Sequence, residues 1–136
     1  MPYATEFFDD GTGLLRVGTG IVTFDEIIAG ARDLHLDEAR ARKLTHALVD
    51  FTGVTELRVS TDEARRIAEA SKTTARLAPG GVVAVVAPKD HVFGMARMWE
   101  TLVDEEAGWL TRVFRERAEA EAWIRARLAN GHRETA

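Results

Sequence analysis

The sequence predicts an α/β domain built on a mixed five-stranded sheet with four helices, in the order β-β-α-β-α-β-α-β-α. Three observations lead to this prediction. Two short segments rich in β-favouring residues open the chain around a turn-rich loop, which is typical of a hairpin. Apolar runs of strand length then alternate with segments of helical periodicity, a pattern that requires parallel strands joined by crossovers. Residues 82–87 (VVAVVA) have no polar face, which indicates an interior strand.

The hairpin and the first helix occupy the N-terminal part of the chain. Residues 3–8 and 14–17 are the expected strands, and residues 9–13 (DDGTG) form the loop between them. Thr23 and Glu26 have the spacing of a capping box, so a helix is expected to begin after Thr23. The apolar stripe of this helix consists of Phe24, Ile27, Ile28, Ala31 and Leu34.

The second strand–helix unit follows the same logic. Residues 46–51 (HALVDF) predict a buried strand. Ser60 and Glu63 repeat the capping-box spacing and open a helix whose narrow stripe is Ala64, Ile67, Ala68 and Ser71. Because this stripe is made of small side chains, the helix is expected to lie close to the sheet.

The C-terminal part contains two more units. Residues 78–81 (APGG) break the chain before the strand at 82–87, and Asp90 is the expected cap of a third helix. Residues 110–114 predict the last strand, and residues 116–128 predict a helix that buries Ala120, Trp123 and Ile124. Asn-Gly at 130–131 predicts a helix end, so we expect one domain over residues 1–130 and a flexible tail over 131–136.

Composition limits the classes of function. The chain has 136 residues, of which 46% are hydrophobic and 29% charged, an ordinary balance for one globular domain. There is no cysteine, which excludes disulfides, thiol nucleophiles and thiolate metal sites and fits a cytoplasmic protein. A net charge of −4 does not favour nucleic acid as partner. The sequence has neither a signal-peptide pattern nor an apolar run long enough for a membrane span.

No constellation of residues predicts an enzyme, a cofactor or a metal. The four histidines (His35, His46, His91, His132) lack the spacing of metal ligands. Asp9-Asp10, Asp50 and Lys89 are similar in type to the residues of receiver domains, but the hairpin turn would hold the acidic pair away from Asp50. Gly18-Thr19-Gly20 lacks the lysine of a P-loop, so a turn or bulge is the better interpretation.

The stretch at residues 48–55 (LVDFTGVT) resembles the STAS domain of anti-sigma-factor antagonists, and in particular the SpoIIAA-like family. The resemblance extends to residues 83–88 (VAVVAP) and residues 93–98 (FGMARM) and covers nearly the whole chain. It implies a non-catalytic regulatory or protein-binding module. The fold of this family has also been likened to that of CRAL-TRIO lipid carriers, which implies an alternative function as carrier of a small apolar or lipid-like ligand.

In STAS antagonists the switch is a phosphorylated serine at the start of the second helix, in the setting D-S-S-G. That setting falls on Arg58-Val59-Ser60-Thr61, where only Ser60 agrees. Ser60 also has a plain structural role as helix N-cap, and this is the favoured interpretation, because Asp62 and Glu63 would repel an added phosphate.

The expected site is the sheet edge where the carboxyl ends of parallel strands meet the N-termini of helices. This edge would bring together Ser60, Asp90, His91 and Phe93 as residues for a ligand or partner. On the third helix, Phe93 either covers the end of the core or joins Arg97 and Met98 in an interface, since aromatic, Met and Arg side chains are enriched there. Self-association as a two-fold dimer is the simplest outcome of the second alternative.

Overall fold

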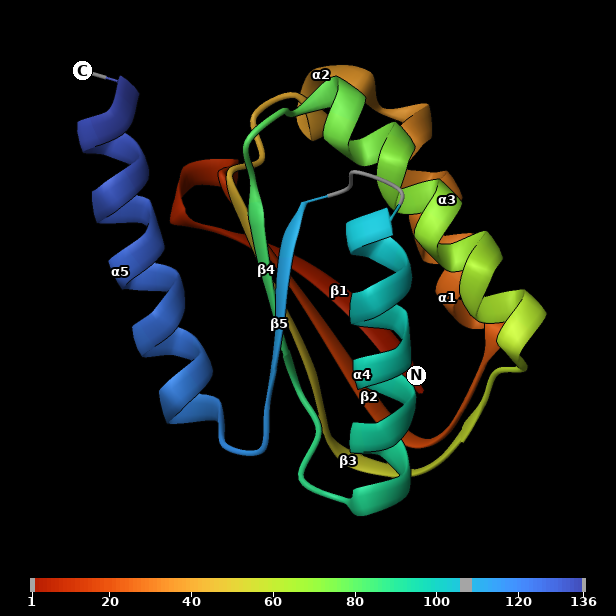
Figure 1. The fold of residues 1–136 in the computed structure, drawn as a ribbon. Coiled ribbons are helices and arrows are strands. Elements are labelled where there is room, and N and C mark those ends of the chain that lie inside the picture. The colour runs from red at the N-terminus through yellow and green to blue at the C-terminus, as the bar shows by residue number, and fades with distance from the viewer. Residues whose placement is uncertain (1, 106–108, 136) are drawn as a thin grey trace.

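The computed structural model describes residues 2–105 and 109–135 and has the predicted central sheet (Figure 1). Its strands follow one another in the order β1-β2-β3-β4-β5. β1 runs antiparallel to β2, and all other neighbours are parallel. The mixed five-stranded sheet is therefore confirmed. The strands are β1 (Tyr3–Phe8), β2 (Gly13–Thr23), β3 (His46–Arg58), β4 (Val82–Val86) and β5 (Leu110–Phe114).

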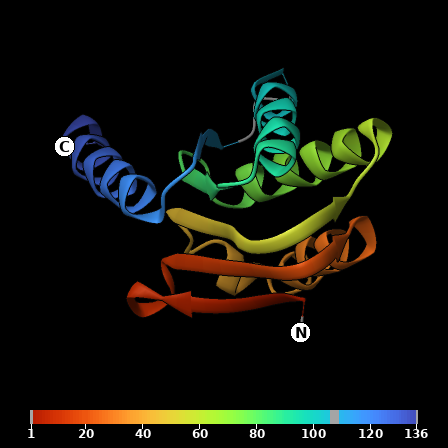
Figure 2. The same ribbon diagram turned by 90° about the horizontal axis from the view of Figure 1, so that it is seen from below.

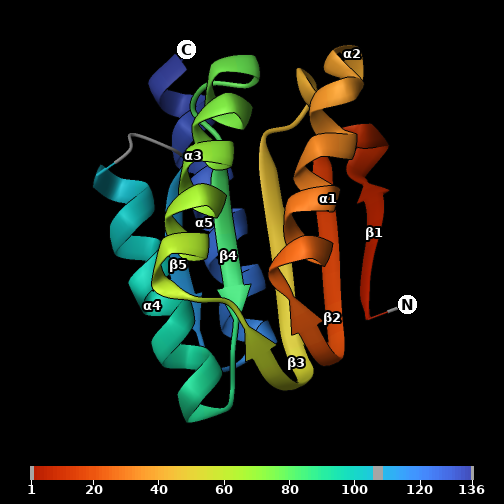
Figure 3. The same cartoon turned by 90° about the vertical axis from the view of Figure 1, so that its right-hand side faces the viewer.

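Helices cover both faces of the sheet unequally (Figures 2 and 3). Three of them, α1 (Phe24–Leu36), α3 (Thr61–Leu77) and α4 (Asp90–Glu105), lie on what we call the three-helix face. Among the helices that the structure describes, α5 (Arg117–Thr135) alone lies on the opposite, one-helix face, against β3, β4 and β5. A short 3-10 turn, η1 (Asp9–Gly11), joins the hairpin strands, and α2 (Glu38–Ala41) is a one-turn helix that the sequence did not predict.

The predicted helix starts and the interior strand are confirmed. Thr23 and Ser60 each close a capping box, at the start of α1 and α3 respectively. β4 is hydrogen-bonded to β3 on one side and to β5 on the other, and every residue of it is buried. The absence of a polar side chain in this strand thus has the expected physical cause, because neither of its faces meets water.

β2 and β3 are longer than predicted and project beyond the rest of the sheet. They stay paired as far as Thr23 and Arg58, whereas β4 ends opposite Asp50. The register shifts after Val17 and again after Gly20, which adopts a φ of 64°. The bulge predicted at residues 18–20 is therefore confirmed, and it bends the projecting β2–β3 ribbon toward the starts of α1 and α3.

Three local predictions were wrong. α3 does not lie close to the sheet, because it packs mainly against α1 and α4, which hold it over the sheet. α5 runs past the Asn-Gly pair at 130–131 as far as Thr135, since an internal glycine costs a helix only about 1 kcal/mol. Asp90 is the first residue of α4 rather than its cap, and its carboxylate bonds Arg115 instead.

Candidate functional site

Ser60 lies exposed at the predicted sheet edge, where it caps α3. Its Oγ accepts a hydrogen bond from the Glu63 backbone N–H at 3.1 Å, and the Glu63 carboxylate accepts one from the Ser60 N–H at 2.9 Å. Both of these bonds satisfy backbone groups that the first helical turn leaves free. The structural role of Ser60 is therefore established by geometry.

The polar residues at the start of α4 fasten this helix to the projecting ribbon. His91 Nε2 donates to the Thr55 carbonyl at 3.1 Å, and Lys89 Nζ donates to the Val54 carbonyl at 2.8 Å. Asp90 Oδ1 accepts from Arg115 at 2.8 Å. Because these side chains are bonded to neighbouring strands and loops, they hold the start of α4 at the edge of the sheet.

Phe93, Arg97 and Met98 do not form one exposed patch. Phe93 is half-buried against a core cluster around Val92, and the Arg115 guanidinium lies 4.2 Å from the centre of its ring. It therefore covers the end of the core. Arg97 is exposed and pairs with Glu100 at 3.1 Å.

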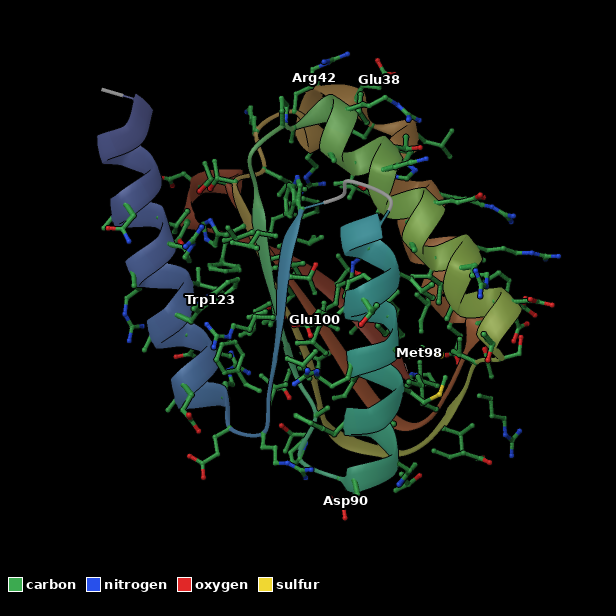
Figure 4. All side chains as sticks on the ribbon, in the orientation of Figure 1. Glu38, Arg42, Asp90, Met98, Glu100 and Trp123 are labelled. Carbon is green, nitrogen blue, oxygen red and sulfur yellow. The ribbon has the colours of Figure 1, made fainter. Side chains whose placement is uncertain are left out.

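Met98 points from α4 toward the N-terminus of α3, whereas Asp90 lies at the first turn of α4 (Figure 4). The Thr61 hydroxyl lies 4.0 Å from the Met98 sulfur. The structure thus brings Ser60 and Met98 onto one surface, formed by the start of α3 and the middle of α4. Asp90 and Phe93 are grouped separately, around Arg115.

The three-helix face contains a cavity that the sequence analysis missed. Its volume is about 160 Å³, and its walls are almost entirely apolar. The sheet forms its floor, and α3 forms its roof with the small inward-facing side chains of Ala64, Ala70 and Ser71. The cavity exists because α1 and α4 hold the roof helix away from the sheet while these side chains are too short to fill the space between.

One buried charge borders this cavity. Arg16 on β2 is only 8% exposed, and among the residues that the structure describes no carboxylate pairs with it. Its guanidinium donates to the Thr5 hydroxyl and to the Gly30 carbonyl, each at 3.2 Å, and lies over the ring of Tyr3. A Cβ at position 30 would come within 2.3 Å of Arg16 Nη1, so the absence of a side chain at Gly30 makes room for the guanidinium.

The cavity wall also contains a buried hydrogen-bond donor, the indole N–H of Trp99. The indole nitrogen of Trp99 is buried and has no hydrogen-bond acceptor among the described residues. The other tryptophan of the cavity wall, Trp109, donates its indole N–H to the Ala78 carbonyl at 2.7 Å. The difference matters because a buried donor without an acceptor destabilises the fold unless a ligand satisfies it.

The ionisable groups near Arg16 respond to burial and to its charge. Burial raises the pKa of the Tyr3 phenol, and Arg16 opposes this effect. Burial lowers the pKa of His35, and the charges of Arg16 and Arg76 lower it further. In both groups burial has the largest effect on the pKa, and the charge of Arg16 contributes to each shift.

Other predicted roles can now be compared with the geometry. Asp50 accepts a hydrogen bond from the Thr52 backbone N–H at 2.8 Å and also pairs with Arg117 at 3.0 Å. His46 is a buried strand-end residue that bonds Asp9 at 3.0 Å, which keeps Asp9 away from Asp50.

Within the described chain no group of three or more potential ligands is arranged to hold a metal ion. None of the helices described has both the length and the apolar character of a membrane span.

Two solved structures share this architecture. The anti-sigma factor antagonist SpoIIAA in its unphosphorylated form superposes with a TM-score of 0.56 and 11% identity, covering 92% of this chain and 97% of that one. The chain has the SpoIIAA-like fold. A protein of the DUF3478 family from Shewanella loihica PV-4, described as having a SpoIIAA-like fold, superposes with a TM-score of 0.53 and 18% identity over 90% of this chain and 91% of that one. No family model matches the sequence, and no curated protein matches it.

Proposed function

We propose that the chain is a non-catalytic regulatory module that acts by binding a protein partner. The observation that carries this proposal is the agreement of the whole SpoIIAA-like fold with an anti-sigma factor antagonist, over nine-tenths or more of both chains. The proposed binding surface is formed by Ser60, Thr61 and Met98, where the exposed cap of α3 meets the side of α4, and Arg97 is the exposed neighbour of Met98 in the sequence.

The bonding of the edge residues supports a non-catalytic role. Lys89 and His91 both donate to main-chain carbonyls, and Asp90 is paired with Arg115. A general acid or base needs a position within hydrogen-bond reach of a substrate. Here the ionisable groups closest to the predicted edge are used to hold β3, α4 and the segment after β5 together.

The same surface is the proposed interface of a two-fold dimer. Met98 is an adaptable apolar side chain, and the exposed Arg97 beside it is of a type enriched in interfaces. Phe93 contributes less, because Arg115 already covers its ring. Light scattering of the wild type and of the variant Phe93→Ala with Met98→Lys tests this point. A monomeric wild type contradicts the dimer, and an unchanged dimer in the double variant places the interface elsewhere.

The experiment for the partner-binding role uses matched surface variants. The purified chain, Met98→Lys with Arg97→Glu, and the control Arg125→Glu on the opposite helix α5 are used to capture proteins from a lysate. We expect a partner that is retained by the wild type and the control and lost by the Met98/Arg97 variant. A partner profile that is identical for all three proteins would contradict the proposed surface.

The alternative function, a carrier of a small apolar or lipid-like ligand, has no support from the two similar structures named above. The cavity limits its scope, because a space of about 160 Å³ accommodates a molecule of roughly the size of benzene.

A further inference from the structure

We propose that the cavity of the three-helix face binds a small apolar monocarboxylate, whose carboxylate pairs with Arg16. This inference goes beyond the proposed partner-binding function, since it concerns the interior of the domain rather than the edge at Ser60 and Met98. It rests on three features of the cavity: its size, the unbalanced charge in its wall, and the unsatisfied donor of Trp99.

The charge is the strongest of the three. A buried arginine is normally paired, because removing a cation from water is costly. The hydrogen bonds that Arg16 makes to Thr5 and Gly30, together with the contact to Tyr3, involve only neutral groups and leave N–H groups of the guanidinium to spare. A carboxylate fits the planar fork of a guanidinium and would supply the missing negative charge.

The lining decides the class of anion. Apart from Arg16, the walls are mainly apolar, and they include Ile27, Val49 and Leu57. One cation balances one negative charge, so a dianionic phosphate would bring a second, uncompensated charge into a low-dielectric space. A monoanion with an apolar body satisfies both the charge and the lining.

The volume decides the size of the ligand. About 160 Å³ matches an aromatic ring or a short aliphatic chain, so benzoate and hexanoate are suitable probes. Trp99, on α4, lines the same cavity, and its indole N–H can bond an acceptor that a ligand carries besides its carboxylate. Benzoate and hexanoate lack such an acceptor, so they test the pairing with Arg16 alone.

Although Arg16 is buried, it also borders a groove outside the cavity. It lines a second, outer groove together with Thr5, Asp33, Asp37 and Arg40. Thr5 and Gly30, to which the guanidinium donates, line this groove as well, so the guanidinium can meet an anion that arrives there. The two aspartates at the groove do not approach Arg16 within pairing distance.

The test compares charged and neutral probes of similar shape on the full chain. Benzoate and benzyl alcohol are titrated to about 10 mM by calorimetry and by amide NMR. We expect benzoate to bind at least about tenfold more tightly than benzyl alcohol, as a charge-assisted pair requires. Arg16→Gln should remove this difference, whereas the control Arg125→Gln, an exposed arginine on α5, should retain it.

A second variant keeps the proposal testable if Arg16→Gln does not fold. Ala70→Leu places a larger side chain in the cavity wall and should weaken benzoate binding at least about tenfold while leaving Arg16 in place. Equal affinity for benzoate and benzyl alcohol, no binding of benzoate, or benzoate affinity unchanged in a folded Arg16→Gln or Ala70→Leu variant would each overturn the proposal.

Discussion

The two faces of the sheet differ in how completely the helices fill the space next to them. On the one-helix face, α5 alone places Ala120 and Ile124 against Leu48, Ala84 and Val86, and all five are almost fully buried. On the three-helix face, three helices leave a cavity of about 160 Å³. The number of helices therefore does not decide how well a face is filled.

Side-chain size at the central helix explains the difference. α3 has alanines at positions 64 and 68, which are fully buried in its contacts with neighbouring helices. α3 packs against α1 and α4, and larger side chains of these two helices, such as Ile27 and Trp99, line the same cavity. A face packed like that under α5 contributes stability, whereas the three-helix face retains space and an unbalanced charge that a ligand can use.

The largest expected effect comes from the same truncation on the two faces. Ile124→Ala should lower the free energy of unfolding by about 2–5 kcal/mol, because Ile124 is packed on all sides. Ile67→Ala on α3 should cost less, since Ile67 is half-buried and already borders the cavity. Urea denaturation measures both, with the exposed Arg125→Ala as control. An equal or greater loss for Ile67→Ala would break the comparison.

The second prediction enlarges one side chain on each face of the sheet instead of truncating it. Ala120→Leu should destabilise the fold by about 1–3 kcal/mol, because Ala120 has no exposed surface and its neighbours cannot give way. Ala70→Leu should leave the stability unchanged or raise it, because the added atoms enter existing space. Thermal unfolding of the two variants separates these outcomes, and a destabilised Ala70→Leu would mean that the roof cannot accommodate the larger side chain.

Most of the fold could be predicted from local signals in the sequence. The two capping boxes, the apolar run at residues 82–87 and the alternation of strands and helices each depend on neighbouring residues. The short helix α2 was missed, since a single turn has almost no periodicity. The height of α3 above the sheet was predicted wrongly, because it depends on the side chains of α1 and α4 rather than on the stripe of α3 itself.

The candidate sites were predictable to different degrees. Topology alone brought the starts of α3 and α4 to one edge, so Ser60 could be expected near the beginning of α4, whereas its nearness to Met98 in the middle of that helix was not predicted. The role of Arg16 could not be predicted, although a charged residue in an otherwise apolar strand sequence (LLRV) was a signal that this position is unusual. Its meaning depends on Gly30 and Tyr3, which are distant in sequence and make room for the guanidinium only in the folded chain.

The third effect concerns the cap of the roof helix. Ser60→Ala should lower the free energy of unfolding by about 1 kcal/mol, because the Glu63 N–H loses its acceptor. Ser60→Asp is the matched control, since an aspartate also accepts this bond and should preserve most of the stability. If alanine and aspartate at position 60 were equally destabilising in urea denaturation, loss of the cap would not explain the lower stability of Ser60→Ala.

The smallest expected effect is a pH dependence that arises on the three-helix face alone. Burial lowers the pKa of His35 from its ordinary value of 6.5, with further contributions from Arg16 and Arg76, and its Nε2 is bonded to the Thr74 hydroxyl at 2.8 Å. Below pH 6.5 the unfolded chain therefore binds the proton more readily than the folded chain. The free energy of unfolding should decrease as the pH falls from 6.5 toward the lowered pKa, and above 6.5 this loss is absent.

His35→Gln should flatten this decrease in urea denaturation series at about pH 7.5 and about pH 5.5, which bracket the ordinary histidine pKa.

An NMR titration of the His35 ring gives a sharper test of the charge in the cavity wall. Arg16→Gln should raise the pKa of His35, because it removes one of the two cations that oppose protonation, and saturating benzoate should raise it in the wild type for the same reason. If the ring titrates at its ordinary value in the wild type and does not respond to Arg16→Gln, the charge of Arg16 is screened, and the contrast between a neutral, packed face and a charged, unfilled one no longer holds.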